Sequence, residues 1–325
     1  MIKHIVTGGA GFIGSHLVEA LVKKKKNVVV LDNLSTGRFE NIKKLKNNIK
    51  FIKADISKKG NWEKEFKGKV YLYHLAALAD IVPSIQEPEK YFQSNVYGTF
   101  NIIEACKKSK VIKFIYSASS SCYGIPKKYP TKENANLDPK YPYALTKKIA
   151  EDLILHWSKI YKIPTISLRL FNVYGTRSRT SGTYGAMFGV FLAQKYHNKP
   201  LTIVGNGTQK RDFIHVEDLS EAIIKCFELK KNYILNLGGG NPVSVIKIAK
   251  MISKKLVFIP KRPGEPDITF ANISLTKKVL KWKPKISIEE GVKRLLIDIC
   301  DWKKAPVWTP KKIKTKTRLW FKYLS

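Results

Sequence analysis

The sequence has few acidic residues, few cysteines and no long apolar run. Lysine and arginine account for 60 of its 325 residues, against 25 aspartates and glutamates, which gives a formal net charge of +35. The four cysteines, at positions 106, 122, 226 and 300, form no Cys-x-x-Cys pair. No stretch approaches the roughly 20 apolar residues of a membrane helix, and the first residues lack the order of a signal peptide. We therefore expect a reduced, cytoplasmic protein with no membrane partner.

Metal-binding patterns and arginine are also scarce. The six histidines show no His-Glu-x-x-His or comparable spacing, so we expect no metal site. Only eight of the 60 basic residues are arginine, the residue that nucleic-acid-binding proteins use for bidentate contacts and stacking. The lysines are spread along the chain, which favours a solvated surface, so we expect no nucleic-acid partner despite the high positive charge. The alternative is a surface for polyanions or membranes, and a basic field would also attract an anionic substrate.

Apolar strand-like runs alternate with helical patterns through the first half of the chain. Residues 143–161 have the apolar spacing of a long helix that follows Pro142. Short β-rich runs, with room for helices between them, occur at residues 48–55, 69–77, 111–119 and 164–175. Strands that alternate with helices predict an α/β fold with a Rossmann-type, doubly wound parallel sheet. The alternation loosens beyond residue 175, which predicts a smaller second domain.

A glycine pattern separates the first predicted strand from the first predicted helix. Gly8, Gly11 and Gly14 form Gly-x-x-Gly-x-x-Gly, which permits a tight turn and brings a pyrophosphate close to a helix N-terminus. Asp32 ends the next strand eighteen residues later, where a carboxylate can accept from both adenosine ribose hydroxyls. Repulsion of a 2′-phosphate there favours NAD over NADP, although Arg38 is a nearby cation that could reverse this preference.

The domain boundaries follow from these patterns. We expect an NAD-binding domain at residues 1–175, to which later segments at about 210–240 return. Residues 176–325 should form mainly the smaller C-terminal α/β substrate-binding domain.

Asp55 ends the third predicted strand, where it is either a turn residue or a partner of the adenine amino group.

A tyrosine and a lysine lie four residues apart on the predicted long helix. Tyr143 and Lys147 therefore share one face of that helix. A neighbouring ammonium and a positive nicotinamide ring both favour the phenolate, so we expect the pKa of Tyr143 to fall from about 10 toward neutrality. Tyr143 would then remove an alcohol proton while Lys147 holds the nicotinamide ribose, and Ser119 would bond the reacting oxygen.

The sequence resembles the extended short-chain dehydrogenase/reductase family, in its nucleotide-sugar epimerase/dehydratase branch. The resemblance runs from residue 6 to about residue 266 and rests on the motifs TGGAGFIG, LDNLSTG, HLAALAD, SASSSCYG, YPYALTK, RLFNVYG, RDFIHVEDL and KRPGEP. It implies NAD as the cofactor and a UDP-sugar as the substrate. It also implies a homodimer, formed by the helix of Tyr143 and a helix near residues 93–109.

The resemblance assigns roles to residues at matching positions. The catalytic residues would be Ser119, Tyr143 and Lys147. The cofactor would contact Gly8, Gly11, Phe12, Ile13, Gly14, Asp32, Asn33, Ser35, Thr36, Gly37, Asp55, Ile56, Leu75, Ala76, Ala77, Asn95, Ser117, Tyr143, Lys147 and Phe171. The substrate would contact Ser119, Ser120, Ser121, Tyr143, Asn172, Arg177, Arg179, Arg211, Arg262, Glu265 and Thr269.

The residues that follow Ser119 indicate the reaction within this family. The 4,6-dehydratases carry an Asp-Glu pair there and the uronate decarboxylases a glutamate, whereas this chain has Ser120 and Ser121. Neutral hydroxyls cannot do that acid–base work near pH 7. The resemblance therefore implies a 4-epimerase, which oxidises C4 transiently, lets the 4-keto sugar rotate and returns hydride to its other face. Cys122 is better explained as a packed core thiol than as a site residue.

The choice of sugar stays open between two classes. Thr269 stands where glucose-restricted epimerases carry a tyrosine beside the sugar 2-position, so an N-acetyl group would fit. This favours UDP-GlcNAc/GalNAc, alone or together with UDP-glucose/galactose. The alternative is a UDP-uronate, whose carboxylate Arg177 and Arg179 could bind. A dehydratase or reductase reaction, or a non-catalytic NAD- or nucleic-acid-binding module, is the competing function.

Overall fold

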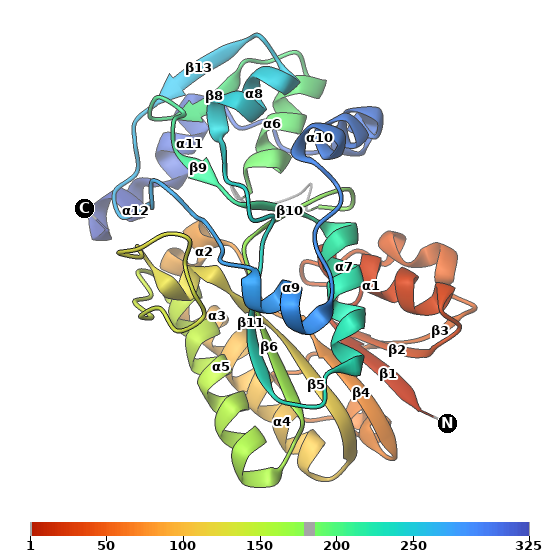
Figure 1. The fold of residues 1–325 in the computed structure, drawn as a ribbon. Coiled ribbons are helices and arrows are strands. Elements are labelled where there is room, and N and C mark those ends of the chain that lie inside the picture. The colour runs from red at the N-terminus through yellow and green to blue at the C-terminus, as the bar shows by residue number, and fades with distance from the viewer. Residues whose placement is uncertain (1, 179–185, 325) are drawn as a thin grey trace.

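The structure is a computed structural model that describes residues 2–178 and 186–324. Its centre is a seven-stranded sheet in the order β11-β6-β5-β4-β1-β2-β3, and every pair of neighbouring strands is parallel (Figure 1). The strands are β1 (Lys3–Thr7), β2 (Asn27–Asp32), β3 (Ile49–Lys53), β4 (Lys69–His74), β5 (Lys110–Ser119), β6 (Thr165–Leu170) and β11 (Tyr233–Leu237). This confirms the predicted α/β fold with a doubly wound parallel sheet.

Helices cover both faces of this sheet (Figure 1). α1 (Phe12–Lys23) and α7 (Val216–Lys225) pack together on one face, and α4 (Gly98–Lys107) and α5 (Pro142–Tyr161) pack together on the other. Each helix turns its buried apolar residues to the sheet, and each leucine or isoleucine buried there contributes about 2 kcal/mol to folding. α5 matches the predicted long helix: proline occupies its first turn, where no N–H is needed, and it ends before Lys162, which has φ 55°.

Many of the remaining elements form a smaller layer over the carboxyl ends of the strands (Figure 1). Its apolar core includes Trp302, Trp308 and Trp320. The short strands are β7 (Asn172–Tyr174), β8 (Leu201–Val204), β9 (Lys210–Arg211), β10 (Phe213–His215), β12 (Val243–Ser244) and β13 (Leu256–Ile259). The further helices are α2 (Ile81–Gln86), α3 (Pro88–Tyr91), α6 (Met187–Tyr196), α8 (Val245–Ile252), α9 (Ser274–Leu280), α10 (Ile288–Ile297), α11 (Pro310–Lys316) and α12 (Arg318–Tyr323), with a π-helix at Phe92–Tyr97 and a 3-10 helix at Ser120–Tyr123. Outside the smaller layer, α9 packs against β11, and α3 and the π-helix pack against α5.

The single strand predicted at residues 164–175 is two strands in the structure. β6 lies in the central sheet, whereas β7 leaves it and pairs with β10. The N–H of Phe171 still bonds the carbonyl of Leu237 at 2.8 Å, but the next N–H, that of Asn172, bonds the carbonyl of Asp212 at 3.1 Å. The chain therefore changes partner at this point, and the change brings Asn172 to the carboxyl end of the sheet.

No helix within residues 2–178 and 186–324 combines the length and the hydropathy that crossing a bilayer would require.

Candidate active site

The glycine loop lies at the carboxyl end of β1, where the strand order of the sheet reverses direction. Gly8 has φ +71°, and a Cβ at this position would lie 2.7 Å from the backbone nitrogen of Ala76. A Cβ at Gly14 would lie 2.1 Å from the carbonyl oxygen of Gly8. Only glycine fits at either position. α1 begins directly after Gly11, so its first N–H groups lie beside the space that the loop leaves open. This cradle fits the pyrophosphate of a dinucleotide.

A carboxylate is held in place at the end of β2. Asp32 accepts hydrogen bonds from the N–H of Ala10 at 2.9 Å and from that of Leu34 at 2.8 Å. Burial raises the pKa of Asp32, and these two hydrogen bonds oppose the rise. Arg38 and Asp32 line one cavity, which is described below, and Nη2 of Arg38 donates to Oδ1 of Asn41 at 3.4 Å. The backbone contacts therefore fix the direction of the Asp32 carboxylate.

Most of the predicted cofactor and substrate residues line one cavity with a volume of about 640 Å³. Its wall includes Gly8, Gly11, Phe12, Ile13, Gly14, Asp32, Asn33, Ser35, Thr36, Asp55, Ile56, Leu75, Ala76, Ala77, Ser117, Ser119, Ser120, Ser121, Tyr143, Lys147, Phe171, Asn172, Arg177, Arg211, Arg262, Glu265 and Thr269. Segments from both layers of the fold thus meet at the same cavity. Arg179 lies outside the described residues.

Two predicted cofactor contacts lie behind this wall rather than in it. Asn95 is 1% exposed; its side chain accepts from the N–H of Leu78 at 2.8 Å and donates to the carbonyl of Leu78 at 2.9 Å. A Cβ at Gly37 would lie 2.9 Å from both carboxylate oxygens of Asp32. Asn95 therefore fixes the loop that follows β4, and Gly37 leaves room for the Asp32 carboxylate.

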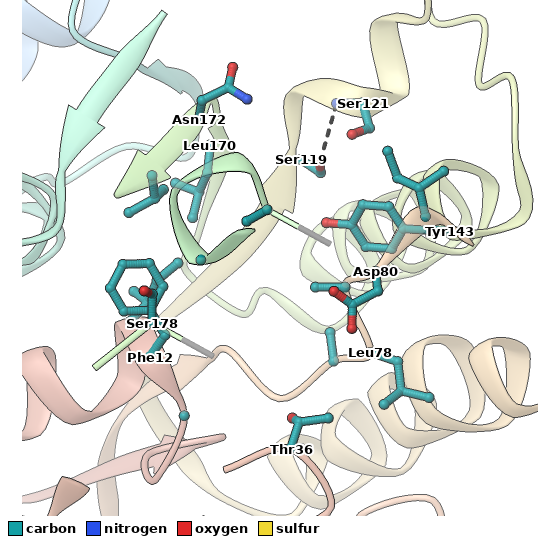
Figure 2. A pocket seen from close by; sticks show the side chains of 18 of the residues that line it. Phe12, Thr36, Leu78, Asp80, Ser119, Ser121, Tyr143, Leu170, Asn172 and Ser178 are labelled. Carbon is teal, nitrogen blue, oxygen red and sulfur yellow. Dashed lines mark hydrogen bonds between the residues drawn. The ribbon is translucent and has the colours of Figure 1, made fainter. Parts of the chain in front are cut away.

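The three predicted catalytic residues come from β5 and α5. The Oγ of Ser119 accepts from the N–H of Ser121 at 3.2 Å, and the Ser119 side chain also hydrogen-bonds the hydroxyl of Tyr143. Figure 2 shows the Tyr143 hydroxyl pointing into the pocket near Ser119, with Asp80 beside the ring. Lys147, one helical turn further along α5, is 3% exposed, and its Nζ lies 4.3 Å from the centroid of the Tyr116 ring.

Burial decides the protonation of these groups. It raises the pKa of Tyr143 well above its usual value near 10, and the Ser119 hydrogen bond offsets only part of the rise. The negative charge of Asp80 adds to the rise. Burial also lowers the pKa of Lys147 to about 8. The predicted fall of the Tyr143 pKa, which combined the Lys147 ammonium with a nicotinamide ring, is therefore not produced by the protein groups alone, because desolvation dominates. A positively charged nicotinamide ring near the hydroxyl would lower the pKa of Tyr143 and so oppose the effect of burial.

The predicted substrate residues Asn172, Arg211, Arg262, Glu265 and Thr269 line one side of the cavity, which we call the substrate wall. Thr269 joins two segments of this wall. The hydroxyl of Thr269 donates to Oδ1 of Asn172 at 2.9 Å and accepts from the N–H of Asp212 at 3.1 Å. The first bond sets the orientation of the Asn172 amide at the cavity. Burial raises the pKa of Asp212 to about 6, while four backbone N–H groups stabilise its carboxylate.

Two arginines share one carboxylate on the same wall. Nη2 of Arg211 donates to Glu265 at 2.8 Å, and Nη1 of Arg262 lies 3.8 Å from the other carboxylate oxygen. The cluster keeps a net positive charge, which suits a diphosphate. Arg177 pairs with Glu19 of α1, and its Nη1 is buried without a hydrogen-bond partner among the described residues.

The cavity also contains residues that sequence reasoning did not select, among them Leu78, Asp80, Tyr141, Phe188, Trp308 and Trp320. Asp80 and Tyr141 stand inside the motifs HLAALAD and YPYALTK, which could have drawn attention to them. Trp320 lies beyond the last motif and carried no such signal. Cys122 does not line the cavity: its thiol contacts the carbonyl of Ala144 at 3.6 Å, and burial raises its pKa to about 12.

Comparisons with known proteins agree with this geometry. The NAD dependent epimerase/dehydratase family matches residues 4–238. A UDP-glucuronate 4-epimerase from Thermodesulfobacterium geofontis is 34% identical over 328 residues, which cover 96% of this chain and 99% of that protein. The solved UDP-N-acetylglucosamine 4-epimerase from Methanobrevibacter ruminantium, in complex with UDP-N-acetylmuramic acid, is 32% identical with a TM-score of 0.84, over 91% of this chain and 98% of that one.

A third protein extends the range of substrates among these relatives. The UDP-glucose 4-epimerase from Thermotoga maritima, solved with UDP-glucose, is 30% identical with a TM-score of 0.85, over 93% of this chain and 98% of that one. Both the family match and the relatives confirm the resemblance stated from the motifs. With its glycine cradle and its Ser119–Tyr143–Lys147 group, the chain belongs to the NAD-dependent epimerase/dehydratase family, an enzyme family whose cofactor is NAD.

Proposed function

We propose that the protein is an NAD-dependent UDP-sugar 4-epimerase. The observation that carries this proposal is a single cavity in which the glycine cradle faces Ser119, Tyr143 and the two arginines of the substrate wall. Ser120 and Ser121 line the cavity where elimination of water would need an acid. The relatives that act on UDP-glucose, UDP-N-acetylglucosamine and UDP-glucuronate support the reaction class and leave the sugar to be determined.

The residues have complementary tasks in this reaction. Tyr143 takes the proton of the sugar C4 hydroxyl and gives it back, and Ser119 holds the oxygen by a hydrogen bond in both directions. NAD, when bound, would supply a reversible hydride acceptor at C4, so the reaction has no net oxidation. Arg211 and Arg262 hold the diphosphate, which lets the 4-keto sugar turn its other face while the nucleotide stays in place.

The substrate wall supports an N-acetylated sugar as one substrate. Thr269 is small, and its hydroxyl is already engaged with Asn172 and Asp212, so the side chain points toward the protein and leaves space at the cavity. We propose UDP-GlcNAc/GalNAc as substrate, alone or with UDP-glucose/galactose. A Thr269→Tyr variant should lose activity on the N-acetylated sugar while activity on UDP-glucose remains. Full activity of this variant on both sugars would contradict the proposal.

A UDP-uronate is the second candidate. The observation in its favour is the buried Nη1 of Arg177, which has no hydrogen-bond partner among residues 2–178 and 186–324. A sugar carboxylate at that atom would supply one. Against it, the same guanidinium already pairs with Glu19. Asp80 is a carboxylate in the same cavity, so the assay must also detect loss of water.

The test is incubation of the purified protein with UDP-glucose, UDP-GlcNAc and UDP-glucuronate in separate reactions, without added cofactor and then with NAD. Proton NMR of the anomeric signals and mass spectrometry follow the products. We expect a galacto-configured product of unchanged mass. A product lighter by one water would indicate a dehydratase, and conversion of none of the three sugars would contradict the proposal.

Tyr143→Phe is the control for chemistry in this assay. The variant keeps the ring but loses the proton acceptor, so activity should fall by a factor of about 10³ or more while NAD remains bound. Absorbance of the denatured protein measures the cofactor content. Retained activity in Tyr143→Phe would exclude this tyrosine as the base.

We also propose a homodimer through α5 and the segment that precedes α4. Apolar side chains there are unusually exposed, namely Phe92 at 46%, Tyr97 at 51%, Leu145 at 47% and Ile160 at 53%. A patch of this kind on packed helices is typical of an interface. Light scattering after size exclusion should give about twice the chain mass of 37.0 kDa, and Leu145→Glu should halve it.

The matched control is a charge at an exposed apolar position elsewhere. Ile297 is 72% exposed on α10, so Ile297→Glu should leave the mass unchanged. A monomeric wild-type protein, or a dimer that survives Leu145→Glu, would contradict this interface.

A further inference from the structure

Trp320 of α12 lies buried against the loop that carries one arginine of the substrate wall. Its side chain is 3% exposed, and its indole N–H donates to the carbonyl of Pro263 at 2.7 Å. The guanidinium carbon of Arg262 lies 5.5 Å from the indole centroid, within the range of a cation–π contact. One side chain therefore holds both the backbone and the charged group of the loop at 262–266.

The same indole meets the catalytic side of the cavity through a second ring. The centroids of Trp320 and Tyr141 are 6.2 Å apart, and those of Tyr141 and Tyr143 are 6.5 Å apart with nearly parallel planes, at 7°. Tyr141 also hydrogen-bonds the side chain of Ser121, and burial raises the pKa of Tyr141 to about 12, so it stays a neutral hydroxyl. Three rings in contact thus join the loop of Arg262 to the catalytic tyrosine.

The segment that carries Trp320 is attached on both sides of the cavity. Nε2 of Gln86, at the end of α2, donates to the carbonyl of Lys316 at 3.3 Å, and Figure 1 shows α12 beside α2. Further along, Leu324 lies against Gly264: a Cβ on that glycine would be 3.8 Å from the Leu324 Cβ. Trp308, on the same segment, also lines the cavity. Residues 303–324 therefore form part of the wall.

We infer that Trp320 is a positioning residue of the substrate site, which fixes the Arg262 loop for the diphosphate of the nucleotide. The inference rests on the proposed function, because it needs a UDP-sugar at this wall. Without the indole, Arg262 loses its aromatic surface and the loop loses its hydrogen bond at Pro263. The positive charge would remain, but it would no longer be held in one place, so binding should weaken more than the chemical step.

The experiment compares Trp320→Phe and Trp320→Ala with the wild type. Phenylalanine keeps a ring against Arg262 and Tyr141 but lacks the N–H that bonds Pro263, whereas alanine removes both. We expect the UDP dissociation constant, measured by calorimetry, to rise about threefold for Trp320→Phe and about tenfold or more for Trp320→Ala. KM for the UDP-sugar should follow the same order, while kcat stays within about threefold.

Tyr323→Ala is the matched control, because Tyr323 lies on the same helix but is 60% exposed. Its UDP affinity and KM should equal those of the wild type. The thermal midpoint of each variant separates folding from binding. If Trp320→Ala does not fold, Trp320→Phe decides alone: unchanged UDP affinity would overturn the inference.

Other outcomes are equally informative. Loss of kcat with unchanged KM in the Trp320 variants would overturn a positioning role for the diphosphate. A wild-type protein that binds UDP but converts no sugar would contradict the proposed function alone, and the UDP titrations would still test Trp320. A wild-type protein that binds no UDP would overturn both.

Discussion

At the scale of single residues, the hydroxyl of Thr269 joins Asn172 to the backbone of Asp212. Thr269→Val keeps the shape of the side chain but leaves an amide oxygen and a backbone N–H without this partner. Such a loss costs about 1–3 kcal/mol when the groups are buried. We expect KM for the UDP-sugar to rise about tenfold, because the Asn172 amide is no longer held.

Thr269→Ser is the control for this prediction, since it keeps the hydroxyl and removes only a methyl group. Its KM should lie close to that of the wild type. Steady-state kinetics of both variants check the result, and a valine variant that behaves like the serine variant would contradict the role of the hydroxyl.

The residues of the site differ in how far sequence could identify them. Gly8, Gly14, Tyr143 and Lys147 were predicted because their function depends on short spacings along the chain, and all four line the cavity. Without the nicotinamide ring, burial raises the pKa of Tyr143 instead of lowering it, and this desolvation depends on packing that no spacing reveals. Trp320 could not be identified at all, since only the fold brings it to the substrate wall.

At the scale of elements, the turn from β1 to α1 has no room for side chains. A Cβ at Gly14 would meet the carbonyl oxygen of Gly8 at 2.1 Å, which would push the helix away from the loop. We expect Gly14→Ala to lower the content of bound NAD by at least about tenfold and to lower the thermal midpoint.

Gly60→Ala is the control for the glycine loop. The backbone at Gly60 is extended, and a Cβ there would meet its nearest atom, in Trp62, at 3.4 Å. NAD content should be unchanged. An NAD content in Gly14→Ala equal to that of the control would contradict the tight approach of the two segments.

Elements with a strong local pattern were predicted well. α5 follows from its apolar spacing and from the proline in its first turn, and its predicted bounds differ from the observed ones by one residue. The strand at residues 164–175 was predicted as one element because its β-rich pattern is continuous. Its division depends on pairing with Asp212 and Leu237, which are too distant in sequence for a local pattern to report.

At the scale of the whole molecule, four buried histidines, His4, His16, His74 and His215, make stability depend on pH. Burial lowers the pKa of His74 to about 3, and of His4 and His16 to about 4. Their pKa in the unfolded chain is near 6.5, so the unfolded state binds more protons below neutrality. The free energy of unfolding should therefore fall as the pH drops from 7.5 to 6, by about 2 kcal/mol in total.

Urea unfolding across this pH range measures the effect. Below about pH 6 the raised pKa of Asp212 acts in the opposite direction, because the folded state then takes up the extra proton. His74→Gln should reduce the slope between pH 7.5 and 6. His156→Gln, at an exposed position on α5, should keep it. An unchanged slope in His74→Gln would show that His74 is not the source.

The pairing of β11 with β6 has a consequence for how the chain folds. All six residues of β6 are buried, and one edge of this strand is covered by residues 233–237, which follow α6, β8 and β10 of the smaller layer in the chain. The edge strand β11 of the central sheet is thus available only after the first part of the smaller layer has been synthesised. A fragment of residues 1–175 would expose an unpaired apolar edge, which is a template for aggregation. We therefore propose that both layers unfold in one cooperative transition, so residue 175 marks a change of layer and not the end of an autonomous folding unit.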